Sequence, residues 1–224
     1  HLVTFHRDHY AADGGFLVVA GDADAATLRP MLEEAFGEWR TGAVPPVPVP
    51  APPAVPARQV LLVDRPESVQ STIQIGFSTV PMNDREWLPL SVANEVLGGD
   101  ASSRLFVNLR DVHGWTYGAY SVVGETALYA PAVLSSDVDG AATGPALREM
   151  FGELRRLGAE PAPAEELAAR QAYMTRVFPL RLETPFSIAS MLATRKLNGL
   201  PDDYWDRYRD AVLAVGPDAA RAAA

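Results

Sequence analysis

Short apolar runs and one alternating run predict the strands of this chain. Residues 15–21 are an apolar run bounded by glycine, as a buried strand would be, and residues 59–64 also read as a strand. Residues 70–77 alternate apolar and polar side chains, which predicts a strand with one buried face and one wetter face. Residues 115–123 and 127–138 are two further strand candidates.

Apolar residues at helical spacing predict the helices. A first helix follows Asp22 and Asp24, which are residue types of turns and helix N-caps. The other predicted helices cover residues 86–97, the segment from Ser102 or Ser103 to Gly114, residues 144–157, 163–177 and 185–197, and a segment after Asp203. Because strands come early and helices cluster late, we expect an α+β fold, with a mixed, largely antiparallel sheet and helices packed on one face.

A proline-rich segment interrupts this pattern between residues 41 and 58. Proline cannot continue a sheet ladder or a helix interior, so the segment predicts an extended, semi-rigid linker. We therefore expect one strand-helix unit over residues 1–43, the linker over residues 44–58 and a larger domain over residues 59–224. The chain begins with His1 and its last residues resemble the middle of a helix, so we expect both ends to be cut.

Charge and composition exclude several classes of function. The formal net charge of −9 argues against a nucleic-acid surface built from clustered Lys and Arg. The absence of cysteine excludes a disulfide framework and a thiolate as metal ligand or nucleophile. No apolar run is long enough to span a bilayer. None of these observations decides between the periplasm and the cytoplasm.

The histidines do not form a zinc motif. They are His1, His6, His9 and His113. A helical zinc pair needs two histidines and a carboxylate on one helical face, whereas His6 and His9 lie in a segment that we interpret as the approach to a strand. We therefore expect surface histidines and no metal in this chain. Ser102 and Ser103 precede a predicted helix, where serine is expected as an N-cap rather than as a nucleophile.

Arg110 and Tyr117 are the candidate catalytic residues. Arg110 lies in the last turn of a predicted helix and Tyr117 lies early in the next predicted strand, with a tight turn at Gly114 between them. A cation and a neutral hydrogen-bond donor at one edge of a sheet suit a peptide carbonyl that becomes an oxyanion. Two simpler explanations stay open, because arginine is also favoured at helix C-termini and tyrosine is common in strands.

The residues around this pair resemble the pitrilysin/insulinase family of metallopeptidases, which includes the mitochondrial processing peptidases and their bacterial relatives. The matching residues are 97–99, 102–106, 109–110 and 114–118. Segments on either side agree in register with the same family, and they are residues 5–10, 18–22, 36–39 and 199–204. The resemblance therefore extends over nearly the whole chain.

The resemblance implies one half of a clamshell zinc metallopeptidase whose two α+β halves close around a peptide. Residues 1–43 look like the closing strand and helix of the first half, whose apolar face we expect to be underburied. Residues 59–224 look like the second half, truncated at its C-terminus. Arg110 and Tyr117 fall on the family's Arg–Tyr pair, in which tyrosine donates to the oxyanion and arginine orients the substrate backbone. Zinc is expected in a partner half or subunit, so the resemblance implies a chain that is inactive alone.

Two other hypotheses for the function stay open. A non-catalytic relative, such as a core subunit of a respiratory complex, uses the same fold as a scaffold. A peptide-binding module could instead accept an extended peptide at a free sheet edge. The sequence does not decide between a homodimer and a heterodimer, and it does not identify the substrate.

Overall fold

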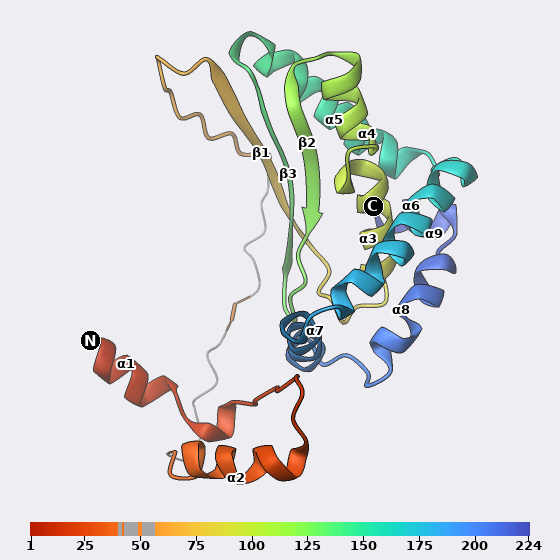
Figure 1. Cartoon of the computed structure of the whole chain (residues 1–224). Coiled ribbons are helices and arrows are strands. Elements are labelled where there is room, and N and C mark those ends of the chain that lie inside the picture. Colours follow the sequence, from red (N-terminus) through yellow and green to blue (C-terminus); the bar gives the residue numbers. More distant parts are fainter. Residues whose placement is uncertain (40–41, 43–48, 51–56) are drawn as a thin grey trace. The chain divides into compact units, whose positions relative to one another are not determined.

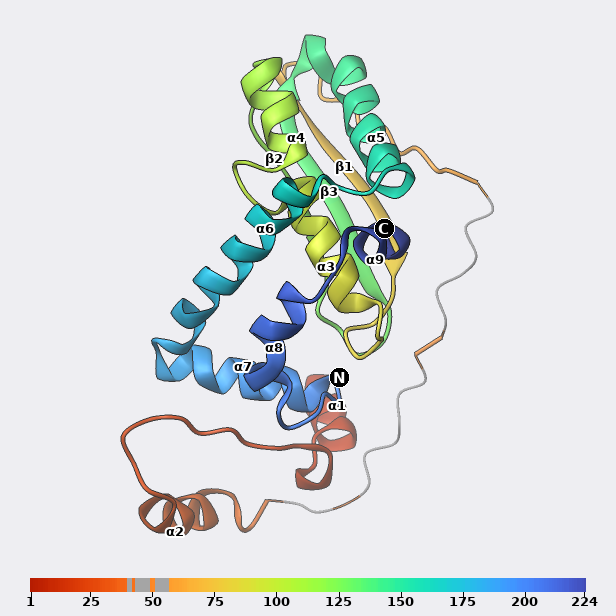
Figure 2. The same ribbon diagram turned by 90° about the vertical axis from the view of Figure 1, so that its right-hand side faces the viewer.

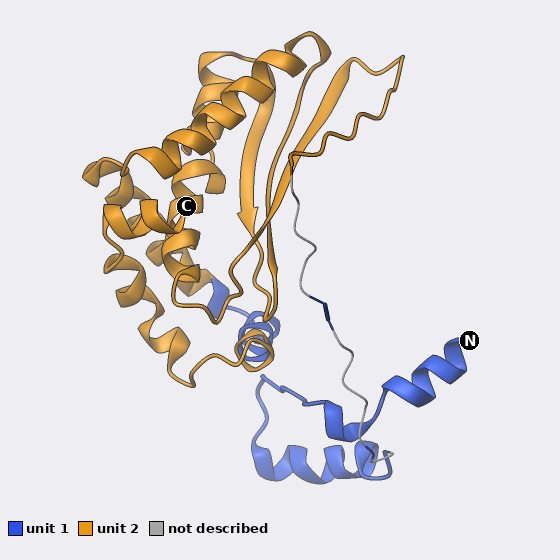
Figure 3. Cartoon of the chain, turned by 180° about the vertical axis from the view of Figure 1, so that it is seen from behind, with its two compact units in different colours: residues 1–51, 181–193 blue, residues 52–180, 194–224 orange. Residues whose placement is uncertain are grey.

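The computed structural model describes residues 1–39, 42, 49–50 and 57–224, so most of the expected linker over residues 44–58 lies outside the described residues. The chain divides into two compact units, which Figure 3 colours separately. One unit contains residues 1–51 and 181–193, and the other contains residues 52–180 and 194–224. The expected division into residues 1–43, 44–58 and 59–224 stays a prediction.

The larger unit is built on an antiparallel three-stranded sheet (Figure 1). Its strands are β1 (Gln70–Thr79), β2 (Thr116–Val123) and β3 (Ala130–Asp139), in the order β1-β3-β2. In the register, Thr72 of β1 lies opposite Asp137 of β3, and Tyr120 of β2 lies opposite Ser135 of β3. The three strands predicted over residues 70–77, 115–123 and 127–138 are confirmed.

Helices cover one face of this sheet (Figure 2). They are α3 (Trp87–Asn94), η2 (Glu95–Gly99), α4 (Arg104–Phe106), η3 (Val107–Val112), η4 (Gly140–Ala142), α5 (Thr143–Ala159), α6 (Ala164–Val177), η5 (Phe178–Leu182), α8 (Tyr204–Leu213) and α9 (Pro217–Ala223). Of these, η5 contributes residues to both units, and so does helix α7 (Pro185–Leu197). The core lies between the sheet and the helices, where Leu105, Leu134 and Met150 are fully buried. The predicted α+β fold, an antiparallel sheet with helices on one face, is confirmed.

Two predicted strands do not form. Residues 15–21 and 59–64 have no ladder partner in the part of the chain that the structure describes. Val60, Leu61 and Leu62 are each at least 85% exposed. A strand needs a neighbour to satisfy its backbone N–H and C=O groups, and an apolar run also needs a cover. Both strand predictions were therefore wrong, because apolar composition alone supplies neither a neighbouring strand nor a cover for the apolar side chains.

The smaller unit has little core of its own. It contains α1 (Leu2–His9), η1 (Ala12–Gly14) and α2 (Ala25–Phe36), and the Asp24 side chain caps α2 by accepting from the Thr27 N–H at 2.7 Å. A hollow of about 680 Å³ is lined by apolar side chains that include Phe16, Leu32 and Trp39. Phe16 and Trp39 are exposed, so the expected underburial of this apolar face is confirmed.

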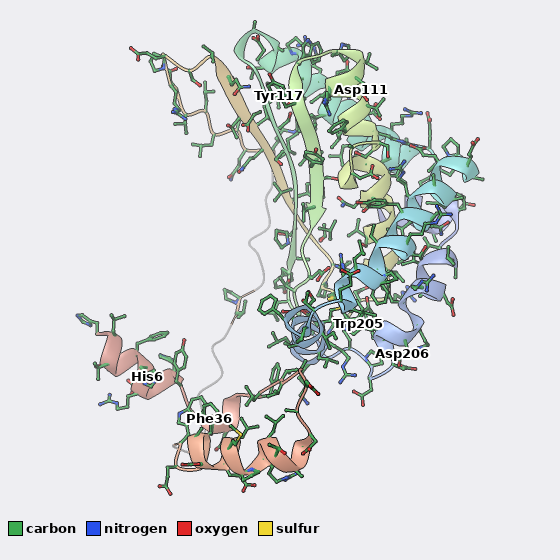
Figure 4. All side chains as sticks on the ribbon, in the orientation of Figure 1. His6, Phe36, Asp111, Tyr117, Trp205 and Asp206 are labelled. Atoms are coloured by element: carbon green, nitrogen blue, oxygen red, sulfur yellow. The ribbon has the colours of Figure 1, made fainter. Side chains whose placement is uncertain are left out.

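The segment around His6 and His9 is a helix, which corrects the expected approach to a strand. Both histidines lie on α1 (Figure 4 labels His6), and their rings pack on neighbouring aromatic rings of the same segment. The ring centres of Phe5 and His9 are 4.5 Å apart, and those of His6 and Tyr10 are 5.1 Å apart. Aromatic pairs four residues apart lie on one helical face, and they favour this local helix.

A close approach of η2 to β2 fixes the helices against the edge of the sheet. A side chain at Gly98 would meet the backbone nitrogen of Ser121 at 2.4 Å, so only glycine allows this contact. The Asn94 side-chain amide donates to the Ser121 carbonyl at 3.1 Å beside it. The chain between η2 and β2 therefore starts from a fixed position.

Two ion pairs with α6 hold the segment that leads into α4. Asp100 accepts from Arg170 at 2.6 Å, and Arg104 donates to both oxygens of Glu166 at 2.7 and 2.8 Å. Ser103 occupies the N-cap position, but its hydroxyl donates to the Asp100 carbonyl at 2.6 Å, so the expected cap hydrogen bond is not formed. The two arginines and two carboxylates form an ionic clamp, the name used below for Asp100, Arg104, Glu166 and Arg170.

Replacing Gly98 by alanine tests the close approach. The added methyl group meets the β2 backbone, which has little freedom to move, so Gly98→Ala is expected to destabilise the fold by about 3 kcal/mol. Gly152→Ala is the matched control, because open space surrounds Gly152 on α5 and alanine favours a helix by about 0.5–1 kcal/mol. Denaturant unfolding of both variants measures the difference. Equal stabilities would show that η2 and β2 do not pack as described.

Glu166→Gln tests the ionic clamp through its pH dependence. The hydrogen bonds from Arg104 lower the pKa of the Glu166 carboxyl below its ordinary value of 4.5, against the opposing effect of partial burial. A carboxyl whose pKa is lowered by folding stabilises the fold at pH values above its ordinary pKa. This stabilisation is lost as the pH falls through the pKa of the folded state. At pH 7 the free energy of unfolding of Glu166→Gln should therefore be about 2 kcal/mol lower than that of the parent. This difference should disappear in acid, where the parent carboxyl is protonated.

The control for the ionic clamp is Glu165→Gln, which removes an exposed carboxyl one position earlier on α6. Thermal melts from pH 3 to pH 7 compare the three proteins. If the difference in melting temperature between the parent and Glu166→Gln stays constant over this pH range, the ionic explanation is contradicted, because the difference then does not follow titration of the carboxyl.

Candidate functional site

A tight turn at Gly114 places Arg110 and Tyr117 on adjacent elements. Arg110 lies in the last turn of η3, and its carbonyl accepts from the Gly114 N–H at 3.0 Å. Gly114 has a φ of 65°, a left-handed conformation that glycine adopts without steric cost. The Trp115 N–H donates to the Leu109 carbonyl at 3.0 Å, and β2 begins at the next residue. The predicted helix, turn and strand are all present.

Arg110 is held by an aromatic ring rather than by a carboxylate. Its guanidinium carbon lies 4.9 Å from the centre of the Phe106 ring, and the side chain is otherwise exposed. Phe106 is buried, and its ring centre is 5.6 Å from that of Tyr120 on β2. A cation over an aromatic face is stabilised without being neutralised, so the charge of Arg110 stays available.

Gly118 explains the position of the Tyr120 ring. A methyl group at Gly118 would meet ring atoms of Tyr120 at 2.6 Å, so the ring lies directly over this residue. The order of contacts is therefore Gly118, Tyr120, Phe106 and Arg110. Gly118 therefore leaves room for the Tyr120 ring to pack at the edge of the sheet. Through Phe106, this ring connects β2 to the helical segment that carries Arg110.

Tyr117 is 88% exposed and lines a hollow of about 510 Å³ on the sheet. Figure 4 shows it at one end of β2, with Asp111 on the neighbouring helix. Among the described residues, neither Tyr117 nor Arg110 makes a hydrogen bond or ion pair through its polar group. Tyr117 lines the hollow whereas Arg110 does not, so a shared groove for the two groups stays a prediction.

The hollow is lined by polar side chains from all three strands. They are Gln70, Thr72, Gln74, Thr116, Tyr117, Tyr120, Ser135, Ser136 and Asp137, together with Gly118. The Thr72 hydroxyl donates to Asp137 Oδ1 at 2.5 Å, and the Ser136 hydroxyl donates to the Gly118 carbonyl at 3.0 Å. The arrangement offers hydrogen-bond donors and acceptors to an extended polar ligand.

The sequence-based reasoning missed most of this lining. The signal was present, because Gln70, Thr72 and Gln74 alternate along β1, and Ser135 and Asp137 alternate along β3. Alternating polar residues on neighbouring strands share a face once the register is known. The register of β1 against β3 spans residues far apart in sequence, and the sequence does not give it.

The described residues offer no ligand set for a metal ion. Within residues 1–39, 42, 49–50 and 57–224, no group of three or more His, Asp or Glu side chains is placed to hold one. His113 stacks on Trp115, with ring centres 4.0 Å apart. Over the same residues, no helix combines the length and the apolar character needed to cross a bilayer.

Comparisons with known proteins agree with this architecture. A protease from Helicobacter pylori has the same fold, with a TM-score of 0.82 at 15% identity, over 91% of this chain and 50% of that one. A peptidase M16 inactive domain from Pseudomonas fluorescens gives a TM-score of 0.64 at 18% identity, over 70% of this chain and 37% of that one. At these identities the likeness shows the fold alone.

Sequence comparison is more specific. An uncharacterized zinc protease of Mycobacterium tuberculosis is 30% identical over 127 residues, which are 54% of this chain and 28% of the relative. The chain therefore matches little more than a quarter of that protein's length. The family described as Peptidase M16 inactive domain matches residues 1–174. Because this match covers most of the chain, the resemblance to the pitrilysin/insulinase metallopeptidases is confirmed, and the chain belongs to the family of peptidase M16 inactive domains, a non-catalytic part of zinc proteases.

Proposed function

We propose that this chain is the substrate-binding, oxyanion-stabilising half of a zinc metalloendopeptidase that acts on peptides or unfolded polypeptides. It is inactive without a zinc-bearing half or subunit of the same family. The observation that carries the proposal is the exposed phenol of Tyr117, which lines a polar hollow and has no structural partner among the described residues.

The proposed chemistry follows from the two side chains. Attack on a peptide carbonyl builds negative charge on its oxygen, and a donor that is already in place stabilises that charge better than water does. Tyr117 would donate its O–H to this oxygen. Arg110, whose charge is not neutralised by a carboxylate, would orient the substrate backbone next to the scissile bond.

The zinc chemistry belongs to the partner in this proposal. A zinc ion in the partner half would polarise the carbonyl and lower the pKa of the attacking water. The described residues of this chain do not fit a zinc site, so the roles assigned to it are binding, orientation and charge stabilisation. This partner is either a separate subunit or another part of a longer polypeptide.

A scaffold is the main rival function, and the exposed pair argues against it. A scaffold needs neither an unpartnered phenol nor an unpaired guanidinium at an accessible edge. Packing would account for Phe106 and Tyr120, whose rings contact each other, but it does not account for the exposed side chain of Tyr117.

Tyr117→Phe tests the proposal. This change removes one O–H and leaves the ring, so turnover of an unstructured peptide should fall by about 10²-fold while peptide affinity changes little. The assay mixes the chain with a zinc-bearing family member from the same genome and measures cleavage by mass spectrometry. Tyr129→Phe, at another exposed tyrosine of the same unit, is the matched control and should leave turnover unchanged.

Unchanged turnover in Tyr117→Phe would remove the phenol from the mechanism. A mixture that cleaves nothing, although both proteins are folded and associated, would favour the scaffold.

A further inference from the structure

The sheet register brings a carboxylate into the hollow that Tyr117 lines. Asp137 lies on the central strand β3, directly opposite Thr72 of β1. Its neighbour Val138 is paired with Thr116 of β2, the residue before Tyr117. Asp137 therefore lies on the strand between the two outer strands, and it lines the same hollow as the proposed oxyanion donor Tyr117.

Asp137 is the one carboxylate among the described residues that line this hollow, and no Lys or Arg is found among them. The other lining groups are hydroxyls, amides and phenols, which are neutral hydrogen-bonding partners. The hollow therefore has a single centre of negative charge on an otherwise uncharged polar surface. The formal net charge of −9 over the whole chain adds a long-range attraction for cations.

The Asp137 carboxylate is not used to stabilise the fold in the way that several other carboxylates of this unit are. Asp100 and Glu166 belong to the ionic clamp, and Asp139 accepts from the Ala141 N–H at 2.8 Å at the start of η4. Asp137 forms no salt bridge within the described part of the chain, and its Oδ1 accepts one hydrogen bond, from Thr72. That hydrogen bond orients the carboxylate through Oδ1, and among the described residues Oδ2 of the exposed Asp137 side chain has no hydrogen-bond partner.

We infer that Asp137 is a specificity residue that selects a cationic side chain, arginine or lysine, in a peptide bound along this face of the sheet. A carboxylate accepts charge-assisted hydrogen bonds from a guanidinium or ammonium group. The neutral side chains around it satisfy the remaining donors of an arginine. The inference rests on the proposed function, because it assumes that the polypeptide substrate lies in the hollow beside Tyr117.

A binding assay tests this inference without turnover. Fluorescence anisotropy compares a labelled unstructured peptide that carries one arginine with the same peptide carrying citrulline, which has nearly the same shape and no charge. The parent chain should bind the arginine peptide about 10-fold more tightly. The preference should decrease as salt is raised, since an accessible charge pair is screened.

Asp137→Asn keeps the shape of the side chain and removes its charge. The variant should bind both peptides within about twofold of each other, with the affinity for the citrulline peptide unchanged. Asp206→Asn is the control, because it removes the same charge from α8, at the opposite end of the unit from Tyr117 (Figure 4). The control should keep the 10-fold preference.

Each outcome distinguishes this inference from the proposed function. A preference that persists in Asp137→Asn, or is absent from the parent chain, overturns the inference even if the mixture with a zinc-bearing partner cleaves peptides. A preference that depends on Asp137, in a chain whose mixture cleaves nothing, supports the inference as a binding site and contradicts the peptidase role. Failure of the parent chain to bind either peptide contradicts both.

Discussion

The close approach of Gly98 to the β2 backbone is the constraint on which the candidate site depends. It allows η2 to pack directly on the edge of the sheet, so that the chain re-enters the sheet at β2 after only two short helical segments. The ionic clamp secures the same segment from the side of α6. Arg110 and Tyr117 then follow from the Gly114 turn, and no long or irregular loop separates them.

The two faces of the sheet have separate roles. Leu134 and Val138 of β3 point to the helices and are fully buried, whereas Ser135 and Asp137 line the hollow on the sheet. Stability therefore comes from one face, and the other is free to carry polar groups that a compact fold does not need. Tyr117 and Asp137 belong to this second group, which is why we propose that they bind substrate.

Much of this architecture could be predicted from local sequence. Alternation predicted β1, and helical spacing predicted α7 over the residues that it occupies. The Gly114 turn, which places the candidate pair, was also predictable because glycine commonly ends a helix in a left-handed conformation. The motif around Arg110 and Tyr117 carried the family resemblance, which the comparison over residues 1–174 confirms.

The predictions that failed concern features set by contacts between residues, which local sequence does not show. Residues 59–64 have the composition of a strand, but a strand forms only beside a partner. The segment at His6 and His9 forms a helix with ring contacts between residues four apart, which the interpretation as a strand approach did not consider. Asp137 was missed because its importance comes from its position opposite Thr72, and strand register is set by tertiary pairing.

The central claim is that substrate lies against the sheet face at Tyr117 when this chain meets its zinc-bearing partner. Site-specific photocrosslinking tests it most directly, with a photoreactive phenylalanine analogue placed at position 117 in one protein and at position 62 in another. The account predicts that peptide crosslinks to position 117 in the mixture with the partner, close to the scissile bond, and not to the exposed residue at position 62. Crosslinking at position 62 alone would place the peptide at the unpaired segment 59–64 and would contradict the account.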